Sequence, residues 1–191
     1  MKGETFSANE PRRLWTRRGV LMGGVSGFAG FFLIRSGAGA SAAEVRAPTL
    51  PKATQEALDT SPLVYISPLL ADGKESRCHG EVWFFVDGGS VVIVTATDRW
   101  KANAVRQGRD QARLWVGDFG QVGRSGDRYR KAPSFVADAE IISDRAVFDR
   151  LLESFAKRYP DGWAKWKPRF EKGFADGSRV MIRYSPASKT V

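Results

Sequence analysis

Polar and basic side chains gather where one apolar run of the sequence ends. The stretch SVVIVTATDRWKANAVRQG contains Thr95 and Thr97 at the end of the run, followed by Arg99 and Lys101. Hydroxyls, cationic side chains and the free amides of a helix start are groups that bind phosphate in proteins. The spacing therefore permits an anion site, such as one for the phosphate of a cofactor. The alternative is a helix capped by Thr97 or Asp98, with its basic residues in solvent.

The single histidine and the single cysteine limit the metal sites and disulfides that the chain can form. Because Cys78 is the single cysteine, the sequence excludes a disulfide within the chain and a zinc site based on cysteine pairs. We expect Cys78 to be buried or half-buried. His79 could ligate a haem, transfer protons near neutral pH or hydrogen-bond a flavin edge. A lone histidine beside a strand start is more often a surface or hydrogen-bonded polar residue, and we expect this of His79. A metal site that needs two or three histidines is excluded.

The elements that must position these residues are mostly strands. Apolar runs, alternation and Asp-Gly turns predict about six antiparallel strands with short helices at the connections. Such strands favour a closed or partly closed β-barrel with flanking helices, with an α+β sandwich as the alternative. Asp98 is the expected N-cap, and Gly108 the expected C-cap, of the helix after the third strand. We expect strands over 62–70, 79–86, 90–97, 111–120, 133–143 and 178–185, helices over 51–60, 99–107, 145–159 and 161–173, and a loop or hairpin tip over 121–131.

Two further segments could contact a ligand. Trp163 and Trp166 are spaced i and i+3, so they share one helix face, and we expect that helix to pack over the barrel mouth. Covering a pocket and forming a dimer contact are the alternatives. A basic loop could meet an acidic substrate, although loop charges are usually solvated; it contains Arg124, Arg128, Tyr129, Arg130 and Lys131.

The first 42 residues resemble a twin-arginine (Tat) export signal. Arg17 and Arg18 precede an apolar, glycine-rich run, and Ala40-Ser41-Ala42 offers a cleavage site. The run is short for a membrane span of about 20 residues, so we expect cleavage and no stable membrane anchor. The sequence thus predicts passage through the Tat translocase to a periplasmic or secreted location. A linker and short helix over 43–60 would then precede one domain over 61–187.

The charge of the chain does not demand a nucleic-acid partner. The 191 residues carry a net charge of +9, with 30 basic and 21 acidic side chains. Residues 1–42 hold six of the basic and two of the acidic residues, so their removal leaves +5. A mildly basic chain with interspersed charges, bound for export, is better suited to a small-molecule ligand than to nucleic acid.

The central segment resembles the FMN-binding split barrel of the pyridoxamine 5'-phosphate oxidase-like superfamily. The resemblance covers roughly residues 55–142, and the closing strand 178–185 fits it. The family pattern is a Trp-Phe strand, an Asp-Gly turn, a strand ending in Thr, and a helix that starts with Arg-Lys. The matching residues are Val82, Trp83, Phe84, Asp87, Gly88, Thr95, Lys101 and Val105.

The resemblance implies a flavin site, a homodimer and redox chemistry on a small organic substrate. It implies that Thr95, Thr97 and Lys101 cradle the phosphate, with help from Arg99. It also implies that the flavin ring lies along strand 80–84. There Gly80 permits close approach of the backbone, Val82 belongs to the contacted strand, and Trp83 walls the ring. Ordinary core packing is the alternative for the aromatic side chains.

One departure from the pattern leaves other functions open. Trp100 stands where many relatives have the arginine before the lysine, and Arg99 lies one position earlier, about 100° around a helix. Lys101 would then hold the phosphate without an adjacent arginine, as a point charge. The alternatives are a cofactor-free split barrel that binds a ligand or partner, or haem or deazaflavin on the same barrel, with His79 as the haem ligand.

Overall fold

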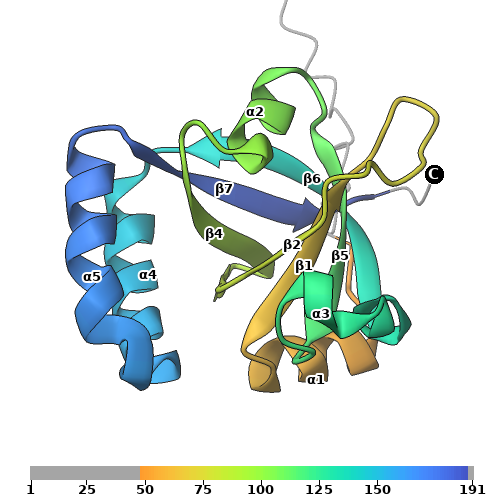
Figure 1. Cartoon of the computed structure of the whole chain (residues 1–191), viewed down its shortest axis with the longest axis horizontal. Helices are drawn as coiled ribbons and strands as arrows, with labels where there is room; N and C mark the ends of the chain where they lie inside the picture. Colours follow the sequence, from red (N-terminus) through yellow and green to blue (C-terminus); the bar gives the residue numbers. More distant parts are fainter. Residues whose placement is uncertain (1–47, 189–191) are drawn as a thin grey trace, which may run out of the picture. The chain divides into compact units, whose positions relative to one another are not determined.

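The chain forms a curled antiparallel β-sheet flanked by helices (Figure 1). The computed structural model describes residues 48–188; the predicted export signal with Arg17 and Arg18, and the start of the linker, lie outside these residues. The sheet has seven strands in the order β2-β1-β5-β6-β7-β4-β3. The strands are β1 (Leu63–Pro68), β2 (Gly80–Val82), β3 (Phe85–Asp87), β4 (Ser90–Ala96), β5 (Gln111–Gly117), β6 (Ser134–Ile142) and β7 (Arg179–Pro186).

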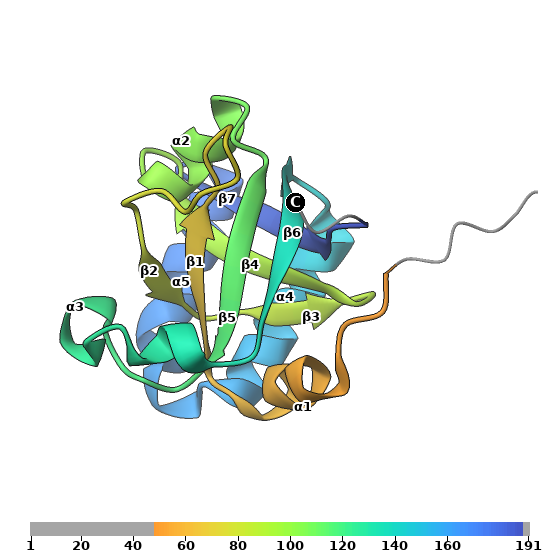
Figure 2. The same cartoon turned by 90° about the vertical axis from the view of Figure 1, so that its right-hand side faces the viewer.

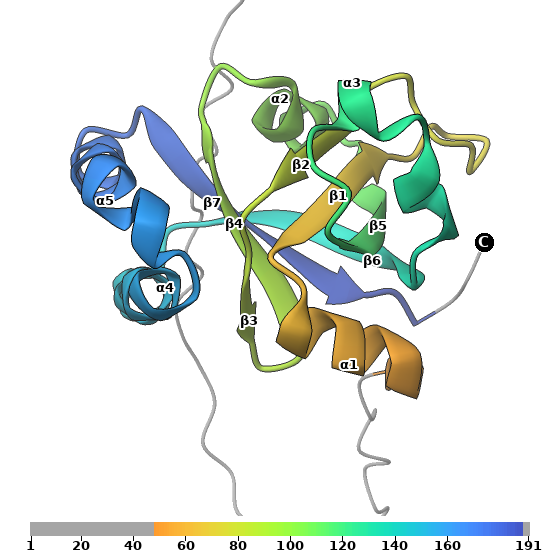
Figure 3. The same cartoon turned by 60° about the horizontal axis from the view of Figure 1, so that its bottom comes forward.

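The helices cover the ends and one outer face of the barrel. They are α1 (Lys52–Thr60), α2 (Trp100–Arg106), α3 (Val122–Ser125), α4 (Arg145–Arg158) and α5 (Pro160–Ala175), with a 3-10 helix, η1, over Arg128–Lys131. Helices α1 and α2 lie at opposite ends of the barrel (Figures 1 and 2). Helices α4 and α5 lie side by side (Figure 3). No helix within residues 48–188 is both long and apolar enough to cross a membrane.

Alternation along the strands builds the barrel interior. In β6, Phe135, Ala137 and Ala139 are buried, whereas Asp138 and Glu140 are exposed. Successive strand residues point to opposite faces of a sheet, so one row of each strand fills the interior. The fully buried members of this core are Val64, Ile66, Phe84, Val91, Ile93, Leu114, Ala137 and Ile182.

A second core forms on the outside of β4 and β7. Val92 and Met181 face outward from the barrel and are buried against α4 and α5. Asp144 is the N-cap of helix α4. The Asp144 carboxylate accepts hydrogen bonds from the amides of Ala146 (2.8 Å) and Val147 (3.1 Å). This cap satisfies two amides that have no partner within the helix and fixes where the helical pair starts.

The run 79–86, predicted as one strand, is broken into two. Strand β2 pairs with β1, and β3 pairs with β4, while Trp83 and Phe84 lie between them. The segment therefore crosses from one end of the sheet order to the other, and the sheet has seven strands instead of about six. The break is the structural basis of the candidate site described below.

Two local predictions were wrong. Asp98 does not cap α2: the N-cap is Arg99, and α2 has no side-chain cap. The carbonyl of Asp98 instead accepts from the side-chain amide of Asn103 (3.0 Å). Residues 121–131, predicted as a loop or hairpin tip, contain α3 and η1. Gly108 follows α2 with a φ of 75°, the left-handed conformation expected of a glycine there.

Candidate ligand-binding cleft

A cleft of about 470 Å³ opens where β2 separates from β4. The C-terminal half of β4 pairs with β7, and β2 pairs with β1, so the two segments flank a gap in the barrel wall. Helices α4 and α5 contribute the outer wall. The volume is in the range of small-molecule sites. The lining residues are Leu63, Glu81, Val82, Trp83, Val94, Thr95, Ala96, Arg99, Phe155, Trp166, Phe170 and Arg179.

The aromatic wall of the cleft is centred on Trp83. Its ring stacks on Tyr159, with centroids 4.2 Å apart and planes within 2°. The edges of Phe155 and Trp166 meet it at 6.0 Å and 6.3 Å. Gly162 allows helix α5 to lie close to Trp83, because a Cβ on residue 162 would lie 2.6 Å from the Trp83 ring. Packing on several sides therefore holds Trp83 in one orientation.

The Tyr159 hydroxyl stabilises the strand break beneath this wall. It accepts from the amide of Phe84 (3.1 Å) and donates to the carbonyl of Pro62 (2.9 Å); the Phe84 carbonyl lies 3.2 Å away. Burial raises the pKa of Tyr159 above its usual value. A residue between two strands lacks sheet partners, so the hydroxyl supplies partners that the break removes.

The mouth of the cleft is cationic. Arg99 and Arg179 line it, and the Arg179 guanidinium lies 5.8 Å from the ring of Trp166. The pKa of Arg179 is lowered by burial and, next, by the positive charges of Arg169 and Arg99. Glu81 also lines the cleft, but its carboxylate accepts from the amide of Val122 (3.0 Å). The site thus combines an aromatic wall with a concentration of positive charge.

The structure divides the residues that the sequence placed in a cofactor site. Val82, Trp83, Thr95 and Arg99 line the same cleft. Thr97 lies beside a neighbouring hollow, and its hydroxyl donates to the carbonyl of Gly177 (2.7 Å). Neither Thr97 nor Asp98, the two caps considered from the sequence, caps α2.

Lys101 and Gly80 contact each other outside the lining of the cleft. A Cβ on Gly80 would lie 2.9 Å from the Lys101 amine, so the amine occupies the space that the glycine leaves. The amine also lies 4.2 Å from the Trp100 ring, a cation–π contact. Burial lowers the pKa of Lys101, although the nearby charge of Glu81 opposes this. Within residues 48–188, Lys101 forms no ion pair.

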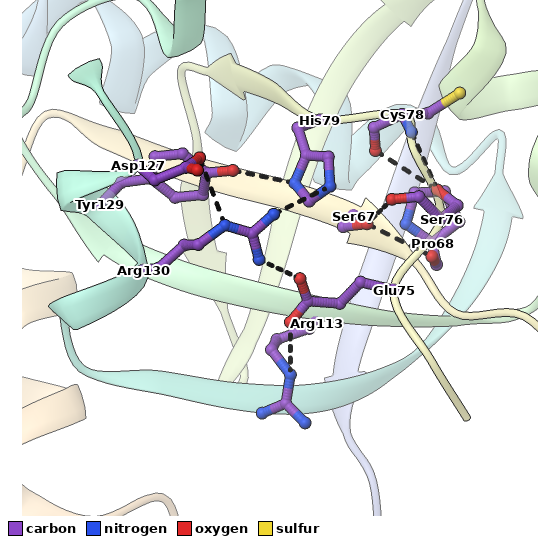
Figure 4. Close-up of polar contacts among 10 residues, drawn as sticks. All are labelled: Ser67, Pro68, Glu75, Ser76, Cys78, His79, Arg113, Asp127, Tyr129 and Arg130. Carbon is purple, nitrogen blue, oxygen red and sulfur yellow. Dashed lines mark hydrogen bonds and ion pairs between the residues drawn. The ribbon is translucent and has the colours of Figure 1, made fainter.

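His79 lies in a different polar cluster, on the outer face of the barrel (Figure 4). Its Nδ1 lies 2.9 Å from the Tyr129 hydroxyl, and its Nε2 lies 3.3 Å from the Arg130 guanidinium. A guanidinium can only donate, so Nε2 accepts and the proton of the neutral ring lies on Nδ1. Both ring nitrogens are thus engaged, as expected for a hydrogen-bonded polar residue.

The same cluster corrects two expectations about exposure. Cys78, expected to be buried or half-buried, is exposed. The basic loop is not simply solvated, because Tyr129 is buried and Arg130 pairs with Glu75 and Asp127. Within residues 48–188, no group of three or more His, Cys, Asp or Glu side chains could hold a metal ion.

Sequence reasoning missed much of the outer wall and the second arginine. Phe155, Phe170 and Arg179 line the cleft, and none was singled out from the sequence. The one available signal was the shared face of Trp163 and Trp166. Trp166 lines the cleft, whereas Trp163 packs against Phe155 and Phe170 (both 6.3 Å).

The curled antiparallel sheet with flanking helices is the split β-barrel fold that the sequence predicted. No family model matches the sequence, and no curated protein matches it. Solved structures do. The conserved hypothetical protein Rv2991 from Mycobacterium tuberculosis is 19% identical, with a TM-score of 0.50 over 74% of this chain and 83% of that chain.

Two more solved structures are similar. A putative pyridoxamine 5'-phosphate oxidase from Listeria innocua is 14% identical (TM-score 0.45; 71% of this chain, 91% of that chain). The haem storage protein HutZ from Vibrio cholerae is 10% identical (TM-score 0.48; 74% and 93%). At these identities, structural similarity shows a fold and not a function.

Proposed function

We propose that this chain is an exported flavoprotein that binds FMN in the cleft between β2 and β4. The observation that carries the proposal is the combination within one cleft of the Trp83 wall and the cationic pair Arg99 and Arg179. FMN has the same two parts, a planar aromatic ring system and a phosphate. The proposed activity is oxidoreduction of a small organic substrate.

The residues of the cleft fit such a group. Trp83 is immobilised by Tyr159 and Gly162, so it offers a rigid aromatic surface. Thr95, near the end of β4, lines the cleft together with Arg99 and Arg179 and adds a hydroxyl to the site. Bound FMN would supply two-electron transfer, and the protein would supply orientation, charge and exclusion of water.

The proposal includes a second copy of the chain and export. A partner subunit, as the sequence resemblance implies, would cover the cleft. Light scattering of the flavin-loaded and flavin-free protein tests this. Export through the Tat translocase is tested by cell fractionation of the full chain and of the double variant Arg17→Lys, Arg18→Lys, which should remain in the cytoplasm.

The first experiment is an absorption spectrum of the protein expressed with its export signal, followed by calorimetric titration with FMN. Bound flavin, or uptake with a dissociation constant near or below micromolar, supports the proposal. The variant Trp83→Leu should weaken uptake, whereas Trp163→Leu, which alters the same aromatic cluster away from the cleft lining, should not. A protein that takes up no FMN as purified or in titration refutes FMN binding.

A cofactor-free ligand-binding protein is the second candidate. The observation that favours it is the position of Lys101, whose amine contacts Gly80 and Trp100 and does not line the cleft. In this case the cleft would take an acidic aromatic ligand directly. Haem bound through His79 gains no support, because Tyr129 and Arg130 engage both nitrogens of the ring.

A further inference from the structure

Arg99 and Arg179 line the mouth of the cleft, and a third arginine, Arg169, contacts the ring of Trp166, which also lines it. Arg99 occupies the N-cap position of α2, Arg169 lies on α5, and Arg179 begins β7. Arg179 is directly opposite Ala96 in the sheet, which brings it beside the turn that leads to Arg99. Burial lowers the pKa of Arg179, and the positive charges of Arg169 and Arg99 lower it further, so both of these guanidinium groups act on Arg179.

Ion pairing with carboxylates balances little of this charge in the part of the chain that the structure describes, and the carboxylate of Glu81, which also lines the cleft, accepts from the amide of Val122. Within residues 48–188, Arg169 and Arg179 form no ion pair. Arg99 has one partner, Asp98 at 3.9 Å, and both side chains are largely exposed (72% and 82%), so the pair contributes little. By contrast, other arginines of the described chain, such as Arg150 and Arg183, are paired with Asp87. The charge at the mouth is therefore available to a ligand.

Aromatic packing, not an ion pair, holds Arg179 in place. Its guanidinium lies 5.5 Å from the Phe170 ring and 5.8 Å from the Trp166 ring. The Arg169 guanidinium lies 5.2 Å from the same Trp166 ring. Gly173 leaves room for the stem of Arg179, because a Cβ there would lie 2.6 Å from its Cγ and Cδ. A cation positioned by packing keeps its hydrogen-bond donors free.

We infer that Arg99, Arg169 and Arg179 form the anion subsite of the cleft and recognise a phosphate or carboxylate on a planar aromatic ligand. The inference rests on the proposed function in that FMN is the ligand used to define the subsite. The acidic group of the ligand would then be bound by Arg179 of β7 and Arg169 of α5, as well as by Arg99 in the turn after β4. Lys101 is excluded from this role because its amine is engaged with Gly80 and Trp100. Guanidinium groups bind phosphate and carboxylate through paired charged hydrogen bonds.

The test compares FMN with riboflavin, which has the same ring system and no phosphate. In the wild type, FMN should bind at least about tenfold more tightly than riboflavin. Arg179→Gln should reduce FMN affinity by roughly 10- to 100-fold and leave riboflavin affinity unchanged, as expected for loss of a charged hydrogen bond. Arg109→Gln, at an exposed arginine without an ion pair within residues 48–188, is the matched control and should change neither affinity.

Lys101→Met separates this subsite from the one that the sequence pattern implies. It should leave the FMN-to-riboflavin ratio intact. If Lys101→Met abolishes that ratio and Arg179→Gln does not, the arginine subsite is wrong. Thermal unfolding of each variant without ligand shows that the fold is retained.

Inorganic phosphate distinguishes failure of the inference from failure of the proposed function. It should raise the wild-type melting temperature more than chloride of equal ionic strength does, and Arg179→Gln should lose this increment. If no flavin binds but this increment is present and depends on Arg179, FMN binding is refuted and the anion subsite stands. If FMN and riboflavin bind equally well, the flavin site stands and the anion subsite is overturned.

Discussion

The substitution Tyr159→Phe removes one oxygen atom from the interior and tests what stabilises the broken strand. The ring remains, so the stack on Trp83 at 4.2 Å should persist. The Phe84 amide, in a residue that is fully buried, loses its partner at 3.1 Å, and the Pro62 carbonyl loses a donor at 2.9 Å. A buried group left without a hydrogen bond costs about 1–3 kcal/mol. We expect the free energy of unfolding to fall by about 2 kcal/mol, which corresponds to a melting temperature lower by roughly 6–10 °C.

Urea unfolding of the wild type and the variant measures this difference. Tyr129→Phe is the matched control, because its hydroxyl hydrogen-bonds the His79 side chain and not the backbone of the strand break, and its own ring also stacks, on Tyr65 at 4.8 Å. It should cost less than about 1 kcal/mol. Hydrogen exchange at the Phe84 amide should accelerate in Tyr159→Phe alone. Equal losses in the two variants, with exchange at Phe84 unchanged, would show that the hydroxyl does not stabilise the break.

Three further predictions concern single contacts. Gly162→Ala places a Cβ 2.6 Å from the Trp83 ring, and despite the helical preference of alanine it should destabilise the fold by about 1 kcal/mol and weaken FMN uptake. Asp144→Ala removes the two amide contacts at the start of α4 and should cost about 1 kcal/mol in urea unfolding. Lys101→Met should stabilise the protein at pH 7. The folded pKa of Lys101 lies below 10.5, so the unfolded chain binds more protons between the two values, and wild-type stability should rise with pH across that window. Unfolding at pH 7 and pH 10 measures the rise, and a rise of the same size in Lys101→Met would contradict the assignment.

Local patterns were sufficient to predict most of the strands. Alternation in Phe135, Ala137 and Ala139 identified β6, and the glycines after Asp87 identified the hairpin between β3 and β4. The break at Trp83 and Phe84 could not be predicted, because residues 82–86 are apolar without interruption. Its position depends on the pairing of β2 back with β1 while β3 pairs with β4, and no local signal marks the point where the partner changes.

The cleft was accessible from the sequence only where its residues are close together along the chain. Val82, Trp83, Thr95 and Arg99 all lie between residues 82 and 99, and all four line the cleft. Arg179 is about 80 residues further on and reaches the site through the pairing of β4 with β7. The amine of Lys101 occupies the space that Gly80 leaves, and a sequence pattern does not specify this direction of the side chain.

The broken strand also bears on self-association. Strands β2 and β3 are the two edges of the sheet, and each is three residues long. They are halves of one continuous segment, so the covalent chain joins the two edges that an open sheet would leave apart. Long, flat edges recruit strands from other molecules, whereas very short edges offer few unpaired backbone groups. The feature that opens the cleft therefore also protects the barrel against edge-to-edge aggregation.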